Sequence, residues 1–394
     1  MAALFWVSLE YVRGHFITGF PWCLMGHSQY EQLPLIQMAE LFGAYGMSFL
    51  ILLVNGAVHR VLFVRETPSR VWVYMERTAV VLAVSGCLIY GNHRLAEIKA
   101  EKAGAKAVRA VIVQANVDQS LKWDASYQRE TIAAYERLTR ASRAFEPQLI
   151  VWPETSVPFF FQRSGEYAPR ILTLARESGA WLLFGSPAYE RTSEVTRYFN
   201  RAYLAPPDGQ ALQFYDKVHL LPFGEYVPLK KVLFFVERLV PAAGDFSRGR
   251  HHDPLTFDPP LGILICYEAI FPEPSGLLAR KGARLLINIT NDAWFGMTGA
   301  PHQHLCMSVF RAVETRTPLI RAANTGISAF IDPTGKIMKK SPLFTESVLK
   351  SRIRIPGTPL PFYARHGDVF ALFSLCLSLG FLGCFSWRRW IARP

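Results

Sequence analysis

The chain has 394 residues, of which 50% are hydrophobic and 19% charged, and its mean hydropathy is +0.14. It is too apolar for one ordinary soluble enzyme and too charged for a protein embedded entirely in a bilayer, so we expect a mixed architecture. The formal net charge is +12, but Lys and Arg are scattered rather than gathered on a basic helix, which favours anionic lipid headgroups over nucleic acid as the counter-charge.

Four apolar segments approach the roughly 20 residues needed to cross a bilayer. They cover residues 3–22, 41–58, 71–91 and 369–387. The second and fourth carry no charge, whereas Glu10 and Arg13 interrupt the first and Glu76 and Arg77 the third. Charges within such segments are rare and usually face the protein interior. We predict that all four are transmembrane.

Basic residues next to these segments predict the orientation, because short loops rich in Lys and Arg stay in the cytoplasm. They lie between the second and third segments and after the last: His59, Arg60, Arg65, Arg70, Arg388, Arg389 and Arg393. Both termini are then cytoplasmic. The predicted domains are membrane segments at 1–91, a catalytic domain at 92–365 on the periplasmic face of a bacterial inner membrane, and a helix with a cytoplasmic tail at 366–394.

The middle of the chain alternates between expected strands and expected helices. Runs of β-branched and apolar residues predict strands at 108–117, 148–154, 181–187, 261–268, 284–290 and 318–324. Apolar residues at helical spacing predict helices at 126–144, 166–178 and 300–316. Turn residues predict hairpins at 201–217 and 327–340. We expect an α/β layered domain with both sheet faces covered.

Cys266 follows four apolar residues at the end of an expected strand. A thiol placed there can act as a nucleophile when a cation and a base lie beside it. A lone cysteine is more often a core residue, which is the better interpretation of Cys306 beside Met307. Glu268 favours a functional Cys266, because residues i and i+2 of a strand share a face and an acidic side chain packs poorly there.

Neither a disulfide framework nor a metal site is predicted. Four of the six cysteines lie in or beside apolar segments, and no CxxC spacing occurs. His302 and His304 are two positions apart, a spacing that a helix does not bring together.

Glu154 and Lys217 supply the base and the cation. Glu154 ends the run LIVWPE and could act as a general base, or could cap the following helix. Lys217 could face the oxygen that becomes negative in a tetrahedral intermediate, although most lysines are solvated. Asp216, His219 and Glu225 crowd the same aromatic stretch, which favours a site. A carboxylate, an ammonium and a thiol suit acyl transfer through a thioester.

Several motifs occur in a fixed order along the chain. The main ones are WPE at 152–154, DKVHLLPFGEYVP at 216–228, CYE at 266–268 and NDAWFG at 291–296, and the others are TGFPW at 18–22, QSLKWD at 119–124 and the stretch 310–326. Together they resemble the nitrilase (carbon-nitrogen hydrolase) superfamily and, in detail, its bacterial apolipoprotein N-acyltransferase family. The resemblance covers almost the whole chain. It implies a nitrilase-like αββα sandwich flanked by transmembrane helices.

The resemblance also implies a catalytic triad, three supporting residues and two substrate-binding residues. These are, in that order, Glu154, Lys217 and Cys266; Glu225, Tyr267 and Glu268; and Trp123 and Trp294. The implied reaction moves an acyl chain from a phospholipid, phosphatidylethanolamine in this interpretation, to the thiol. The N-terminal amine of a diacylglyceryl-modified apolipoprotein then accepts it. No metal or organic cofactor is implied.

Several alternatives stay open from the sequence. The aromatic runs at 158–162 and 233–240 could enter the outer leaflet and guide acyl chains, or could pack in the core. Members of the family usually have several more membrane helices before the segment that begins here at residue 4. The start of this chain could be misassigned, a separate polypeptide could supply the missing helices, or this branch could work with a reduced membrane part. A membrane-tethered amide hydrolase and a catalytically silent partner subunit are the other possible functions.

Overall fold

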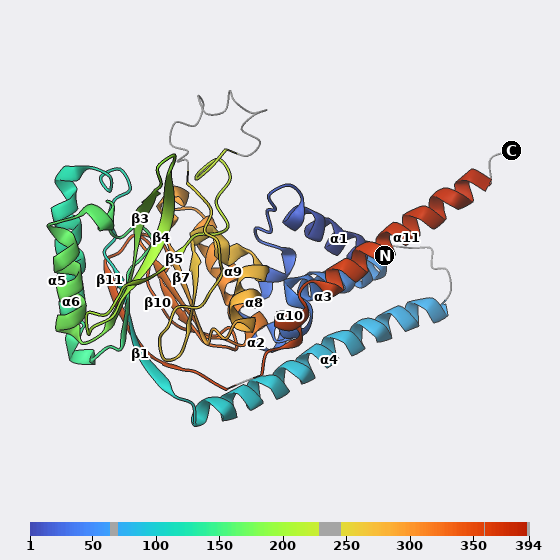
Figure 1. Cartoon of the computed structure of the whole chain (residues 1–394). Coiled ribbons are helices and arrows are strands. Elements are labelled where there is room, and N and C mark those ends of the chain that lie inside the picture. The colour runs from blue at the N-terminus through green and yellow to red at the C-terminus, as the bar shows by residue number, and fades with distance from the viewer. Residues whose placement is uncertain (64–69, 228–245, 358, 392–394) are drawn as a thin grey trace.

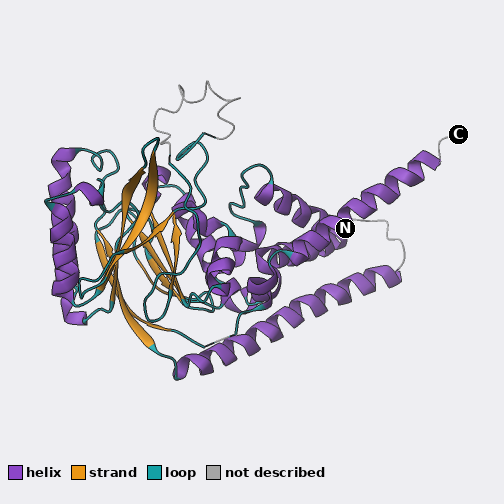
Figure 2. Cartoon of the chain, viewed as in Figure 1, coloured by secondary structure: helices purple, strands orange, loops and turns teal. Residues whose placement is uncertain are grey.

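Two β-sheets lie face to face at the centre of the molecule, and helices cover the outer face of each (Figure 2). The computed structural model describes residues 1–63, 70–227, 246–357 and 359–391. Long helices extend away from one side of the sandwich (Figure 1). The expected αββα architecture with flanking apolar helices is therefore confirmed.

The first sheet has six strands in the order β11-β1-β2-β3-β4-β5. They are β1 (Ala107–Gln114), β2 (Leu149–Val151), β3 (Trp181–Arg191), β4 (Thr196–Ala205), β5 (Gln213–Asp216) and β11 (Ser347–Arg354). Strands β1, β2 and β3 are parallel, and the others join antiparallel. The carboxyl ends of β1 and β2 therefore meet at the same edge of the sheet.

The second sheet has five strands in the order β10-β9-β8-β7-β6. They are β6 (Leu261–Ile265), β7 (Leu285–Thr290), β8 (Leu319–Ala323), β9 (Ala329–Ile331) and β10 (Ile337–Lys340). Strands β6, β7 and β8 are parallel. Buried aliphatic side chains from both sheets, including Val108, Ile112, Ile263 and Ile287, form one core between them.

Different helices cover the two outer faces. α5 (Gln128–Ala141) and α6 (Tyr167–Ser178) pack on the first sheet around Trp152 and Phe184. α8 (Pro272–Arg280) and α9 (Ala300–Thr315) pack on the second. Almost the whole of α9 is buried, because the membrane helices cover its other side.

The expected strands, helices and hairpins are all present, with ends that differ by a few residues. Strand β11 was not predicted. Its sequence SVLKSRIR mixes apolar residues with Lys and Arg, as suits an edge strand with one exposed face. It pairs with β1, and its buried residues are Ser351 and Ile353, of which Ile353 belongs to the core between the sheets.

Three described helices are long and apolar enough to cross a membrane, over Ala39–Phe63, Val73–Ala103 and Val369–Trp387. They belong to α3 (Ala39–Phe63), α4 (Arg70–Ala103) and α11 (Val369–Ile391). The expected first span at 3–22 differs, because α1 (Ala2–His15) ends early and the chain then turns toward the sandwich. α4 continues well past residue 91, so the expected domain boundary lies inside this helix. The short helices α2 (Leu33–Ile36) and α10 (Phe362–His366) complete this layer.

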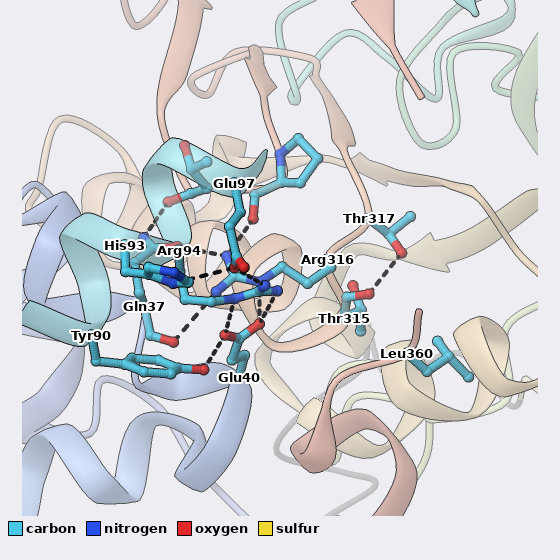
Figure 3. A network of polar contacts seen from close by, with 12 residues as sticks. Gln37, Glu40, Tyr90, His93, Arg94, Glu97, Thr315, Arg316, Thr317 and Leu360 are labelled. Carbon is cyan, nitrogen blue, oxygen red and sulfur yellow. Dashed lines mark hydrogen bonds and ion pairs between the residues drawn. The ribbon is translucent and has the colours of Figure 1, made fainter. Parts of the chain in front are cut away.

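A buried polar network joins the membrane helices to the sandwich (Figure 3). At its centre, the Glu40 carboxylate of α3 accepts hydrogen bonds from Arg94 Nε of α4 over 2.7 Å and from Tyr90. Arg316, which follows α9, donates to Glu40 and also to Gln37 Oε1 over 2.6 Å. Since the Glu40 and Arg316 side chains are almost fully buried, each charge depends on the other for compensation.

Candidate active site

Cys266 lies where strand β6 ends and the chain turns sharply. β6 ends at Ile265, and a short 3-10 helix begins at Cys266. The Cys266 backbone is in the left-handed region, with φ 52°, which costs a non-glycine residue about 1–3 kcal/mol. Such a strand-to-helix turn lifts a nucleophile out of the sheet. Cys266 accordingly keeps some accessible surface although all of β6 is buried.

Two side chains hold the carbonyl oxygen of Cys266. His304 Nε2 lies 3.2 Å from it, and Asn288 Nδ2 donates to it over 3.4 Å. Arg321 Nη2 lies 3.0 Å from His304 Nδ1 and donates to Asp292 Oδ2 over 2.7 Å. Burial and the Arg321 charge lower the pKa of His304, and its Nδ1 lies 3.0 Å from both Asp292 Oδ1 and Arg321 Nη2. This buried network fixes the turn at Cys266.

Glu154, Lys217 and Glu225 come together in one buried cluster. Lys217 Nζ lies 2.8 Å from Glu225 Oε2 and 4.0 Å from Glu154 Oε1. Asn200 Nδ2 bridges the two carboxylates, donating to Glu154 Oε1 over 2.7 Å and to Glu225 Oε1 over 2.9 Å. Lys217 is only 1% exposed and Glu154 6%. The interpretation of Lys217 as a solvated lysine is therefore wrong.

The charges of this cluster act on the thiol. Burial and the Glu154 carboxylate raise the pKa of Cys266 to about 12, and the Lys217 ammonium opposes them. Burial also raises the pKa of Glu154. Although burial opposes it, the Glu225 carboxylate, with Cys266 and Glu154, holds the pKa of Lys217 well above its usual range. At neutral pH the thiol is thus protonated and Lys217 charged, so the thiol needs a base when it reacts.

Glu268 is fully buried and organises the backbone. Its Oε1 accepts from the amides of Val218 and His219 over 2.8 and 3.0 Å, and its Oε2 accepts from the Ile265 amide over 2.7 Å. It therefore ties the loop after Lys217 to the end of β6. The argument that Glu268 shares a strand face with Cys266 was wrong, because the chain has already left the strand at Cys266.

Tyr267 faces the segment that follows the first helix. Its hydroxyl donates to the Gly19 carbonyl over 3.2 Å, and its ring lies against Phe271 and His219. Trp22, in the same segment, contacts the His304 ring and donates to Gln303 Oε1 over 2.7 Å. The TGFPW motif at 18–22 thus lies against the turn that carries Cys266.

Asn200 and Lys122 belong to the site but were not predicted from the sequence. Asn200 lies in the middle of the long strand β4, whose sequence is TRYFNRAYLA. Its polar side chain beside aromatic and apolar neighbours is the one sign in the sequence of a functional role. Lys122 is 2% exposed, and its Nζ donates to the main-chain oxygen of Glu154 over 3.2 Å. Lys122 belongs to the QSLKWD motif, but a buried lysine cannot be distinguished from a surface lysine by sequence alone.

The two expected substrate-binding tryptophans lie in different places, and both are exposed, Trp123 by 54% and Trp294 by 69%. Trp123 lines an apolar pocket of about 430 Å³. The other lining residues are Gln128, Pro158, Phe159, Phe160, Pro187, Tyr198 and Phe246. Trp294 lies on the short helix Asp292–Phe295 and does not line this pocket.

No disulfide joins the cysteines, all of which lie among the described residues. All six cysteines are free, and Cys306 is half-buried on α9, where burial raises its pKa to about 12. Within residues 1–63, 70–227, 246–357 and 359–391, no three His, Cys, Asp or Glu side chains are grouped as a metal ion would require.

The structure thus places a thiol at a strand-end turn beside a buried Glu-Lys-Glu cluster, on an αββα sandwich. The sequence model of the carbon-nitrogen hydrolase family matches residues 109–358, and the chain belongs to this family. A second model, the apolipoprotein N-acyltransferase N-terminal domain, matches residues 1–57.

Relatives narrow the assignment. The chain is 48% identical to the apolipoprotein N-acyltransferase of Geobacter metallireducens, over 93% of this chain and 70% of that protein. It is 36% identical to the apolipoprotein N-acyltransferase of Bradyrhizobium diazoefficiens, over 94% of this chain and 70% of that protein. A carbon-nitrogen hydrolase structure from Helicobacter pylori aligns with 63% of this chain and 89% of its own, at 19% identity and a TM-score of 0.48. Within the larger family the chain belongs to the apolipoprotein N-acyltransferases, which are acyltransferase enzymes.

Proposed function

We propose that this chain transfers an acyl chain from a phospholipid to the N-terminal amine of diacylglyceryl-modified apolipoproteins, through a thioester on Cys266. One observation carries the proposal. Cys266 stands at an accessible strand-end turn beside a buried cluster that contains a carboxylate base and a fixed ammonium. A neutral thiol, a buried base and a cation are the groups that acyl transfer requires.

In the first half-reaction, Cys266 Sγ attacks the sn-1 ester carbonyl of the phospholipid, and the thiol proton passes to Glu154. The carbonyl oxygen becomes negative and faces the Lys217 ammonium. When the intermediate collapses, the C–O bond breaks and the alcohol oxygen of the lysophospholipid takes the proton from Glu154. The products are an acyl-thioester on Cys266 and a lysophospholipid, with Glu154 ionised again. Phosphatidylethanolamine is the donor that we propose.

In the second half-reaction, the α-amine of the acceptor attacks the thioester carbonyl. Glu154 takes a proton from the amine, the C–S bond breaks and the proton returns to sulfur. The free thiol is restored and an amide is formed. Glu225 does not need to move a proton, because its bond to Lys217 serves to hold the ammonium beside Glu154.

The direction of the long helices supports a proposed membrane orientation. α3 leads away from the sandwich, α4 returns to it and α11 leaves it again (Figure 1). His59 and Arg60 therefore lie toward the end remote from the sandwich, and Arg60 pairs with Glu76 of α4 over 2.8 Å. Arg65 and Arg393 lie outside the described residues. On the basis of the positive-inside rule, we propose that the catalytic domain, residues 92–365, lies on the periplasmic side of the inner membrane and that the protein is multi-pass.

Phe160→Ser tests whether the pocket beside Trp123 guides acyl chains. Phe160 lines this pocket, and its ring packs against Tyr189 and Tyr198. We expect acylation with phospholipid in proteoliposomes to fall about tenfold, as loss of much of a buried aromatic contact predicts. Hydrolysis of a short-chain soluble ester should change less than twofold. Equal losses on both substrates would contradict the pocket's role. The second aromatic run, with Phe234, lies outside the described residues.

The overall proposal is tested with the full chain in proteoliposomes that contain phosphatidylethanolamine and a diacylated lipopeptide. We expect N-acylated peptide and, without the peptide, a protein whose mass is increased by one acyl group on Cys266. Cys266→Ala should give neither, and Cys306→Ala should behave as the wild type. Free fatty acid without acylated peptide would indicate a hydrolase, and no product from the wild type would indicate a silent subunit.

A further inference from the structure

Lys122 is a second buried lysine beside the proposed active site. It follows strand β1, whereas Glu154 follows the parallel neighbour β2, so both lie at the same edge of the first sheet. Its ammonium donates to the main-chain oxygen of Glu154 over 3.2 Å. Its positive charge also acts on the Glu154 carboxylate and on Cys266. Trp123, the next residue, is exposed in the apolar pocket.

The charges of the buried cluster explain why a second cation is needed. Glu154 and Glu225 share the Asn200 amide, and the Lys217 ammonium lies nearer to Glu225, at 2.8 Å, than to Glu154, at 4.0 Å. A buried carboxylate without full compensation takes up a proton and can no longer act as a base. Lys122 supplies the missing positive charge, and its interaction opposes the rise in the pKa of Glu154 that burial causes.

A purely structural role for Lys122 is the competing explanation. Burying an ammonium is unfavourable, and burial lowers the pKa of Lys122 to about 8. An apolar side chain would fill the same space at less cost if only packing were required. The ammonium donates to the main-chain oxygen of the proposed base, Glu154, which ties this costly charge to the site rather than to the core.

We propose that Lys122 is a positioning residue of the acyl-transfer site, which fixes the main chain of Glu154 and keeps its carboxyl group ionised. The inference rests on the proposed function, in which Glu154 is the base for Cys266. Lys122 then acts through Glu154 and not on the substrate. Its effect should be visible as a shift in the pH at which the enzyme becomes active.

The groups that face the Glu154 carboxyl group from the surrounding elements are Asn200, Lys217, Glu225, Cys266 and Lys122. Of these, only Lys122 is changed in the test. Lys122→Gln removes the charge and retains a donor for the Glu154 carbonyl oxygen. Lys122→Arg retains the charge. Lys102→Met is the control, because it removes a lysine that pairs with Asp332 and does not belong to the cluster of Glu154, Lys217 and Glu225.

The measurement is kcat/KM for peptide acylation in proteoliposomes from pH 5 to 9. The acid limb reports protonation of the free enzyme's base. Removing a positive charge raises the pKa of that base, so the limb of Lys122→Gln should move upward by about one pH unit. At a fixed pH on the acid limb, well below that pKa, activity should therefore fall about tenfold, mainly in kcat. Lys122→Arg and Lys102→Met should keep the wild-type limb within about 0.3 unit.

A second readout does not require turnover. Alkylation of Cys266 by iodoacetamide, followed by intact mass in the full chain, should be slower in Lys122→Gln and normal in Lys122→Arg. An unshifted acid limb together with unchanged alkylation, or equal losses in Gln and Arg variants without a shift, would overturn the inference. Cys266→Ala is assayed beside these variants. If Cys266→Ala still acylates the peptide, the proposed function is wrong. If Cys266→Ala is inactive and the acid limb of Lys122→Gln is unshifted, only the proposed role of Lys122 is wrong.

Discussion

Glu154→Gln is expected to reduce peptide acylation by about 1,000-fold, within the range that a positioned general base contributes. The thiol of Cys266 carries its proton at neutral pH, because burial and the Glu154 carboxylate raise its pKa to about 12. Attack on the ester therefore needs a base at the moment of reaction. Glutamine keeps the size and the hydrogen-bonding capacity toward Asn200 Nδ2, so the folded site should persist.

The loss should be nearly all in kcat, and both half-reactions should slow. Single-turnover formation of the acyl-enzyme, followed by mass, measures the first half, and transfer from a preformed acyl-enzyme to peptide measures the second. Glu177→Gln is the control, since this glutamate pairs with Arg140 and Arg143 at the surface. Acyl-enzyme formation at the wild-type rate in Glu154→Gln would rule out Glu154 as the base.

Arg321→Met is expected to destabilise the protein by about 3–5 kcal/mol, because it removes one partner of a buried ion pair. Arg321 and Asp292 have fully buried side chains, and Nη2 donates to Oδ2 over 2.7 Å. Despite burial, the Arg321 charge, with hydrogen bonds from His304 and Arg321, holds the pKa of Asp292 well below its usual range. An aspartate with a depressed folded-state pKa contributes stability above its unfolded-state pKa, and loses it as the pH falls through the folded-state value. The loss in Arg321→Met should therefore be fully present at pH 7.

Thermal unfolding in detergent measures this effect, and Tm should fall by about 10 °C for a domain of this size. Arg352→Met on the exposed face of β11 is the control and should change Tm by less than about 2 °C. The double variant Asp292→Asn with Arg321→Met should be less destabilised than Arg321→Met alone, since no buried charge then lacks a partner. An equal Tm for the two would contradict the ion-pair explanation.

The sequence predicts the sandwich well because its strands are short, apolar and separated by amphipathic helices or clear turns. Strand β11 shows the limit of such prediction: five of its eight residues are polar, and its pairing with β1 is what identifies it as a strand. α1 shows a second limit: the apolar segment 3–22 looks continuous in the sequence, but the helix ends at His15 and the rest of the segment forms a loop. Tertiary contacts with the sandwich determine where this helix ends, and the local sequence pattern does not reveal those contacts.

The candidate site divides along similar lines. Cys266, Glu154 and Lys217 are recognisable because each stands in a motif at the end of an apolar run. Asn200 is not, because an amide inside a strand gains its meaning only from the two carboxylates that fold against it. Lys122 likewise depends on burial, which the chain achieves by placing the segments after β1 and β2 side by side.

The shared core around α9 has a practical consequence. Phe310 and Val313 of α9 lie in the same apolar cluster as Ala39 and Met47 of α3, and Arg316 finds its counter-ion in Glu40. A secreted fragment trimmed to the sandwich would present this face bare to water and would aggregate. The helices that anchor the enzyme in the bilayer thus also cover and support the catalytic domain. Crystallisation, labelling and kinetic experiments therefore require the intact polypeptide in a lipid-like environment.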